Sequence, residues 1–257
     1  MSEATILSRR HGAVAQVVLN RPAKRNALDW PMLDGLVTTL RGFDVDPDIR
    51  AAVISGEPRA FAAGADIGAL GEASAMELYR SGFSEQWDAV AAIETPIVAA
   101  VSGYCLGGGL ELALICDIVV CERGAVFGLP EAAIGTLPGA GGTQRLVRAV
   151  GKSLAMEMIL AGRRLDAEEA CRFGLASTLV EAGAAEAEAL ALAGRIAERA
   201  PLAARFAKRA VLQSFETPLS AGIAFERALS ALMAASEDRA EGMRAFAEKR
   251  TPRFTGR

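Results

Sequence analysis

The sequence contains a single histidine, His11, among 257 residues. His11 precedes a glycine in a predicted hairpin turn, so a Ser-His-Asp triad is not indicated, and a site that needs several histidines is excluded. The four cysteines show no C-x-x-C spacing, which argues against a zinc ribbon or a redox motif. We therefore expect chemistry that uses carboxylates and backbone groups, with no metal or redox cofactor.

An excess of positive charge is also missing, because 28 Lys and Arg residues stand against 31 Asp and Glu residues. This balance gives no electrostatic basis for binding nucleic acid. The first twelve residues lack the apolar core of a signal peptide. The apolar stretch 96–121 is interrupted by Glu111, Asp117 and a glycine cluster, which argues against a membrane-spanning helix. We expect a cytoplasmic protein that does not bind membranes, with its cysteines reduced.

The stretch 102–131 holds the most unusual local pattern of the chain. Residues 107–111, GGGLE, follow a predicted buried strand at 97–101 and open an apolar helix. The first N–H groups of a helix have no partner within it and lie at the positive end of its dipole. Because glycine also lets a ligand approach the backbone closely, this segment is predicted to bind an anionic oxygen.

Two acids accompany the glycine cluster. Glu111 lies about one helical turn after Gly108 among apolar residues, and Glu131 follows the segment 127–130, FGLP. Taken alone, each acid has an ordinary interpretation, either on the exposed face of an amphipathic helix or at a helix start. The alternative interpretation is a pair of carboxylates beside an oxyanion-binding backbone.

Two further glycine-bearing segments interrupt the regular pattern. Residues 61–67, FAAGADI, form either a tight turn or a second place where the backbone approaches a ligand. Residues 137–143, LPGAGGT, form a loop before a predicted helix. Neither known nucleotide motif is present: GKS at 151–153 lacks the earlier glycine of a phosphate loop, and 107–112 lacks the third glycine of the dinucleotide fingerprint.

Strand and helix patterns alternate up to residue 183, which favours an α/β layer architecture. The patterns predict strands at 6–10, 13–19, 51–55, 97–101 and 176–180, and helices from residue 31, over 74–93 and over 144–150. Only helices are predicted afterwards, at 184–199, 202–214, 219–235 and 237–250. We divide the chain into a catalytic core, 1–183, and a helical segment, 184–257, that caps the core or packs on a neighbouring subunit.

The polar connection at 20–28 contains three cations, Arg21, Lys24 and Arg25. Such a segment is usually a solvated loop. The functional alternative is that these cations contact a phosphate group of a ligand.

Taken together, these segments resemble the enoyl-CoA hydratase (crotonase) family over nearly the whole chain. The resemblance rests on the order and spacing of NRP and NAL at 20–28, FAAGADI at 61–67, GGGLEL at 107–112, FGLPE at 127–131 and GTLPGAGGTQRL at 135–146. It implies an α/β fold, a spiral of ββα units with a helical C-terminal segment that forms trimers, commonly paired into hexamers. The implied activity is hydration of trans-2-enoyl-CoA to 3-hydroxyacyl-CoA, with coenzyme A as part of the substrate.

The resemblance also implies roles for single residues. The two backbone N–H groups that bind the thioester oxygen fall on Ala65 and Gly108, and the two catalytic glutamates fall on Glu111 and Glu131. Further substrate contacts are expected from Ala63, Asp66, Ile67, Trp87, Lys24, Arg25 and Lys249, where Lys249 matches a lysine near the coenzyme A phosphates.

One position departs from the family pattern. Many hydratases have a lysine after the Ala-Asp-Ile segment, where this chain has Gly68, so Lys24, Arg25 or Arg59 is expected to compensate. Three other activities remain open on the same scaffold: isomerisation of enoyl-CoA, dehydration of a specialised hydroxyacyl-CoA, and thioester hydrolysis. A non-catalytic relative that binds coenzyme A or RNA is the alternative from another class.

Overall fold

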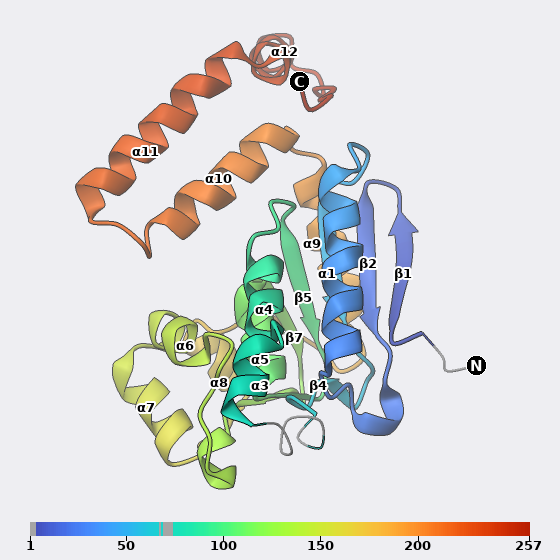
Figure 1. Cartoon of the computed structure of the whole chain (residues 1–257). Coiled ribbons are helices and arrows are strands. Elements are labelled where there is room, and N and C mark those ends of the chain that lie inside the picture. The colour runs from blue at the N-terminus through green and yellow to red at the C-terminus, as the bar shows by residue number, and fades with distance from the viewer. Residues whose placement is uncertain (1–3, 67, 69–73) are drawn as a thin grey trace.

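The computed structural model describes residues 4–66, 68 and 74–257, and its strands form two sheets (Figure 1). The larger sheet has the order β1-β2-β3-β5-β7-β10. Its β1 and β2 pair antiparallel as the predicted hairpin, and the other neighbours pair in parallel. The strands are β1 (Ile6–His11), β2 (Val14–Leu19), β3 (Ala51–Ser55), β5 (Ile97–Val101), β7 (Ile118–Glu122) and β10 (Thr178–Val180).

The smaller sheet has the order β4-β6-β8-β9. Its strands are β4 (Ala60–Ala62), β6 (Tyr104–Leu106), β8 (Val126–Gly128) and β9 (Leu165–Asp166). Each of β3, β5 and β7 in the larger sheet is followed along the chain by β4, β6 and β8 in the smaller one. Because helices follow these strand pairs, the chain repeats a ββα unit, as the sequence resemblance implied.

The inner strands β3 and β5 of the larger sheet are buried on both faces, which is why they read as continuous apolar runs. Alternate residues of β3 enter different cores: Ala52 and Ile54 belong to the main core, and Ala51 and Val53 to a second one. The main core packs against α1 (Trp30–Val45), α4 (Phe83–Ala91) and α5 (Gly108–Ile115), and the second core against α9 (Ala185–Ala197) (Figure 1).

The smaller elements connect these layers. They are η1 (Pro22–Lys24), η2 (Glu131–Ile134), α6 (Gly142–Val150), α7 (Lys152–Leu160) and α8 (Ala167–Arg172). Asp29 caps α1 by accepting a hydrogen bond from Met32 N, as its position before the apolar pattern suggested.

The helix predicted over 74–93 is in fact two helices. Ser74 and Glu77 form the expected capping box at the start of α3 (Ala75–Arg80). Gly82 then adopts a left-handed conformation with φ +71° and separates α3 from α4. The prediction of one continuous helix was wrong, because the apolar periodicity continues through a glycine whose backbone leaves the helical region.

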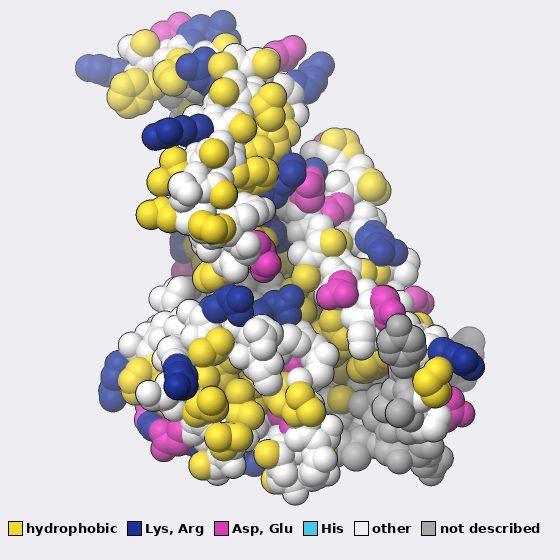
Figure 2. Space-filling view, turned by 60° about the vertical axis from the view of Figure 1, so that its left-hand side comes forward, with side chains coloured by type: hydrophobic (Ala, Val, Ile, Leu, Met, Phe, Trp, Pro, Cys, Tyr) yellow, Lys and Arg dark blue, Asp and Glu magenta, His cyan; other side chains and the backbone are white. Residues whose placement is uncertain are grey.

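The C-terminal helices beyond α9 form a projection that we call the arm, residues 201–247. It consists of α10 (Pro201–Gln213), α11 (Leu219–Leu232), η3 (Met233–Ala235) and α12 (Glu237–Ala247), and it extends away from the two sheets (Figure 1). Hydrophobic side chains lie along its surface (Figure 2). The two sheets and the helices that cover them form what we call the body of the molecule. Since α9 packs on the larger sheet, the first helix of the predicted 184–257 segment belongs to this body and not to the arm.

A partly buried ion pair joins the arm to the body. Lys208 Nζ of α10 lies 2.8 Å from Asp117 Oδ2, and it also donates to Thr95 O at 3.2 Å. Asp117 in turn accepts a hydrogen bond from Ile97 N at the start of β5.

Among the described residues, no helix is long and apolar enough to cross a membrane.

Candidate active site

The triple glycine lies at the start of α5, in a tightly packed corner between the two sheets. Gly107 has φ +51°, a conformation that favours glycine, and its N–H donates to Gly128 O at 2.9 Å. A Cβ atom at Gly109 would overlap the backbone of Ala62 in β4. The glycines therefore let the positive end of α5 meet the end of β4.

Ala65 and Gly108 bring two backbone N–H groups together at this corner. Leu28 N donates to Gly64 O and Asp66 N donates to Leu28 O, both at 2.8 Å, so the Ala65 N–H is not used in this pairing. A Cβ atom at Gly108 would lie 3.4 Å from Ala65 N. In the part of the chain that the structure describes, neither N–H has an acceptor. Two adjacent unpaired donors are suited to bind an oxygen that becomes negatively charged.

Glu111 is buried, with 4% of its surface exposed, so the exposed-helix interpretation does not hold. Its Oε1 accepts hydrogen bonds from Ala140 N at 2.7 Å and Gly142 N at 2.8 Å. A Cβ atom at Gly142 would lie 2.9 Å from Oε1, so only glycine allows this close approach. Burial raises the pKa of Glu111, while the two amides and Arg145 act in the opposite direction. Oε2 is left for other contacts.

Glu131 begins η2, and its side chain lies against Gly107, at the start of the same glycine cluster. A Cβ atom at Gly107 would lie 3.0 Å from its Oε1. Its Oε2 is buried and has no hydrogen-bond partner in the structure. Burial, with a smaller contribution from the charge of Glu111, raises the pKa of Glu131 to about 7. A carboxyl group in this state holds a proton near neutral pH, so the two acids differ in their readiness to give or accept one.

Trp87 of α4 is both a core residue and a neighbour of this site. Its side chain is buried, and its Cη2 would lie 3.5 Å from a Cβ atom at Gly108. The Trp87 ring packs edge-on against Phe83, which in turn contacts Trp30. Trp87, one of the expected substrate contacts, therefore lies beside the glycine cluster.

The other predicted contact residues are dispersed. Ala63 and Asp66 lie within two residues of Ala65, but the Asp66 carboxylate forms an ion pair with Arg21 at 3.1 Å. The hydrogen bond from Arg21 lowers the pKa of Asp66. Ile67 lies outside the described residues. Asp66 is thus occupied by a contact within the protein.

Of the predicted cations, Lys24 and Arg25 lie in and just after η1, and both are exposed. The Arg25 guanidinium packs over the Tyr104 ring at 5.9 Å. Lys249 follows α12, at the end of the arm that projects from the body (Figure 1). The structure does not bring Lys249 together with the other predicted residues of the same chain.

Sequence reasoning missed the role of the loop that holds Glu111. The segment 137–143 was recognised as a glycine loop, yet nothing in its pattern linked it to an acid 29 residues earlier in the chain. Arg145 was also missed, although it donates from Nη1 to Ala140 O at 2.9 Å. The signal that the sequence offered for this loop was the high glycine content of residues 137–143.

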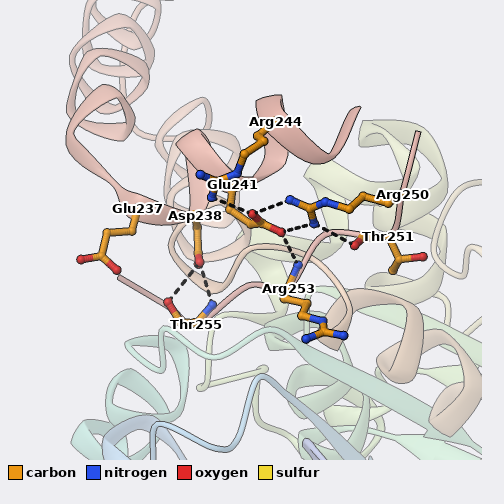
Figure 3. Close-up of a pocket in the computed structure, with 8 residues that line it drawn as sticks. All are labelled: Glu237, Asp238, Glu241, Arg244, Arg250, Thr251, Arg253 and Thr255. Carbon is orange, nitrogen blue, oxygen red and sulfur yellow. Dashed lines mark hydrogen bonds and ion pairs between the residues drawn. The ribbon is translucent and has the colours of Figure 1, made fainter. Parts of the chain in front are cut away.

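A separate pocket lies between α12 and the C-terminal tail (Figure 3). Its central acid, Glu241, accepts hydrogen bonds from Arg244 and Arg250 and from the backbone of Arg253, and these contacts lower the pKa of Glu241. Asp238 accepts from the backbone of Thr255 and Gly256. These acids fasten the tail to α12, since both carboxylate oxygens of each accept hydrogen bonds within the protein.

The chain is similar to known proteins over nearly its whole length. A family model described as enoyl-CoA hydratase/isomerase matches residues 9–257. A probable enoyl-CoA hydratase of Mycobacterium bovis and a 2,3-dehydroadipyl-CoA hydratase of Escherichia coli are each 46% identical to the chain, over 100% of both sequences. The crystal structure of an enoyl-CoA hydratase from Bacillus anthracis is 33% identical, with a TM-score of 0.94, over 98% of this chain and 100% of that one.

Proposed function

The chain belongs to the enoyl-CoA hydratase/isomerase family, and we propose that two carboxylates and two backbone amides carry out its reaction. The protein is an enoyl-CoA hydratase, a hydro-lyase acting on acyl-CoA thioesters, and its fold is the α/β crotonase-like fold. The reaction adds water across the 2,3 double bond of a trans-2-enoyl-CoA and gives the 3-hydroxyacyl-CoA.

The backbone amides of Ala65 and Gly108 bind the thioester oxygen. When water attacks the β-carbon, electron density moves towards this oxygen, and the transition state is enolate-like. Donors that already point at the oxygen stabilise that charge without reorganisation, and one such donor is typically worth about 3 kcal/mol. The two unpaired N–H groups, one at Ala65 after β4 and one at Gly108 at the start of α5, support this role.

Glu111 orients and deprotonates the water. Its Oε1 is fixed by Ala140 N and Gly142 N, which leaves Oε2 to accept the proton. Glu131 delivers a proton to the α-carbon. Its buried, unpartnered Oε2 and its pKa of about 7 support that assignment, because a proton donor must carry its proton at working pH.

The observation that carries the mechanism is the contrast between the two acids. Glu111 accepts two backbone hydrogen bonds, which favour its charged form, whereas Glu131 has a buried oxygen with none. Hydration needs one group that accepts a proton from water and another that donates a proton to the α-carbon. The contrast between the two acids therefore favours hydration over isomerisation, in which a single group can move the proton. The deciding assay compares turnover of crotonyl-CoA with that of a 3-enoyl-CoA, where faster isomerisation than hydration would reject the mechanism.

A non-catalytic relative that binds coenzyme A or RNA is the competing class. The net charge of −3 and the pairing of buried Glu111 with half-buried Glu131 both count against it. A non-catalytic protein of this class would bind acyl-CoA or RNA tightly and turn over none of the enoyl-CoA substrates tested.

We further propose that the protein acts in the cytoplasm as a trimer or a dimer of trimers. The exposed apolar side chains of the arm support assembly, because such surfaces are rarely left in contact with water. The phosphates of coenzyme A are proposed to contact Lys24, Arg25 or Arg59, together with Lys249. Independence from metals and redox cofactors stays a prediction.

A further inference from the structure

Arg145 extends from α6 to the loop that holds Glu111. Its Nη1 donates to Ala140 O at 2.9 Å, while Ala140 N donates to Glu111 Oε1 at 2.7 Å. The carbonyl oxygen and the amide nitrogen of Ala140 are therefore both fixed, one by a cation and the other by the buried acid. A loop held at both groups has little freedom to change the direction in which the Ala140 N–H points.

The local backbone is shaped to admit the Arg145 side chain. Gly141, the residue before α6, has φ +97°, and a Cβ atom there would overlap Arg145 Nη1. Arg145 N also donates to Gly141 O at 2.8 Å. Glycine at position 141 thus lets the guanidinium fold back against the loop that precedes its own helix.

Two charged side chains influence Glu111 in the described part of the chain. Arg145 approaches from α6, and Glu131 approaches from η2. Arg145 forms no ion pair within residues 4–66, 68 and 74–257, so its charge is not neutralised by another carboxylate. It opposes the effect of burial on Glu111.

We propose that Arg145 is a positioning residue for Glu111, acting through the backbone of Ala140. By fixing the Ala140 carbonyl, Arg145 restrains this residue, keeps both amide hydrogen bonds on Oε1 and leaves Oε2 directed at the attacking water. The inference rests on the proposed role of Glu111 as the base, and it assigns a function to the last part of the GTLPGAGGTQRL segment.

The test compares Arg145→Met with Arg148→Met in crotonyl-CoA hydration. Arg148 is a matched control, since its Nη1 donates to a backbone carbonyl, Gln144 O, at 2.8 Å on the same helix but away from the loop. Because small errors in positioning are costly, we expect Arg145→Met to lower kcat by up to about 100-fold with little change in KM. Arg148→Met is expected to behave as the wild type.

The pH profile separates positioning from a merely structural role. Arg145 favours the charged form of Glu111, so removing it raises the pKa of this base, and the acid limb of kcat/KM moves to higher pH. Arg145→Lys keeps the charge and is expected to return the acid limb towards its wild-type position with a partial gain in kcat. It also serves as the test variant if Arg145→Met fails to fold.

A double-mutant cycle with Glu111→Gln distinguishes the possible failures. If Arg145 acts through Glu111, Arg145→Met has little further effect once Glu111 is replaced. A wild-type kcat and acid limb in folded Arg145→Met would overturn the inference alone, and so would an equal loss in the Glu111→Gln background. If Arg145→Met does not fold, a wild-type kcat in Arg145→Lys would overturn it. Normal turnover by Glu111→Gln would instead reject the proposed function.

Discussion

A Cβ atom at Gly108 would lie 3.4 Å from the amide nitrogen of Ala65. The two residues are far apart in the sequence and meet because the start of α5 packs against the end of β4. Their N–H groups are the two proposed donors to the thioester oxygen. The space beside them is therefore narrow enough for a single methyl group to matter.

Gly108→Ala is expected to lower kcat for crotonyl-CoA by about 100-fold, the effect of losing one such donor. The added methyl group occupies space beside Ala65 N and Trp87, while the backbone at 108 needs no glycine conformation. The control is Gly139→Ala in the active-site loop, where a Cβ atom meets nothing within 4 Å. Equal activity of both variants would contradict the donor assignment.

Glu111→Gln is expected to lower kcat by orders of magnitude, with an unchanged melting temperature. The amide oxygen of glutamine can still accept from Ala140 N and Gly142 N, but the side chain cannot take a proton from water. Glu122→Gln is a matched control, because buried Glu122 also accepts from two backbone N–H groups, those of Gly183 and Ala185, away from the site. The proposal fails if the two variants have similar turnover.

Hydration is expected to decline as the pH rises through about 7. The pKa of Glu131 is raised to about 7, so its proton is present below this pH and lost above it. Because Glu131 donates that proton, kcat/KM should show a basic limb near this value, measured with crotonyl-CoA between about pH 5 and 9. The two acids titrate as a pair, so the limb reports the loss of the last proton from the pair. A flat profile through this range would speak against Glu131 as the donor.

Asp117→Asn is expected to lower the free energy of unfolding by about 3 kcal/mol, because it leaves the Lys208 ammonium without its partner. The two side chains are 17% and 9% exposed and lie 2.8 Å apart. Urea unfolding at fixed protein concentration measures the change. As a control, Arg195→Met breaks the exposed pair with Glu188 and should alter stability by at most about 0.5 kcal/mol. Similar losses in both variants would argue against the Lys208–Asp117 pair as the anchor of the arm.

Replacing Val211 and Leu219 together by Asp is expected to dissociate the assembly. These arm residues are 63% and 81% exposed in the single chain, and burying a charge in an apolar contact is costly. Sedimentation should show a trimer or hexamer for the wild type and monomers for the variant. Val45→Asp, at an equally exposed position at the end of α1, should leave the assembly intact. A monomeric wild type would contradict the proposed oligomer.

Most of the secondary structure followed from local patterns. The hairpin β1-β2, the capped start of α1, the strands β3 and β5 and the four C-terminal helices lie within a few residues of their predicted bounds. Their signals are local, since apolar periodicity and capping residues act within one or two turns. The break between α3 and α4 was missed because the conformation of Gly82 depends on how both helices pack.

The sequence by itself determined the presence of the parts: a glycine-rich helix start, two acids with the right spacing and an apolar helical tail, and their order identified the family. Only the tertiary structure decided whether each acid is buried or exposed and which hydrogen bonds it forms. Periodicity favoured an exposed Glu111, whereas packing buried it against the amides of Ala140 and Gly142, and left Glu131 with a buried oxygen that has no partner. Burial and hydrogen bonding set the protonation of both acids, and each depends on segments that are distant in the chain.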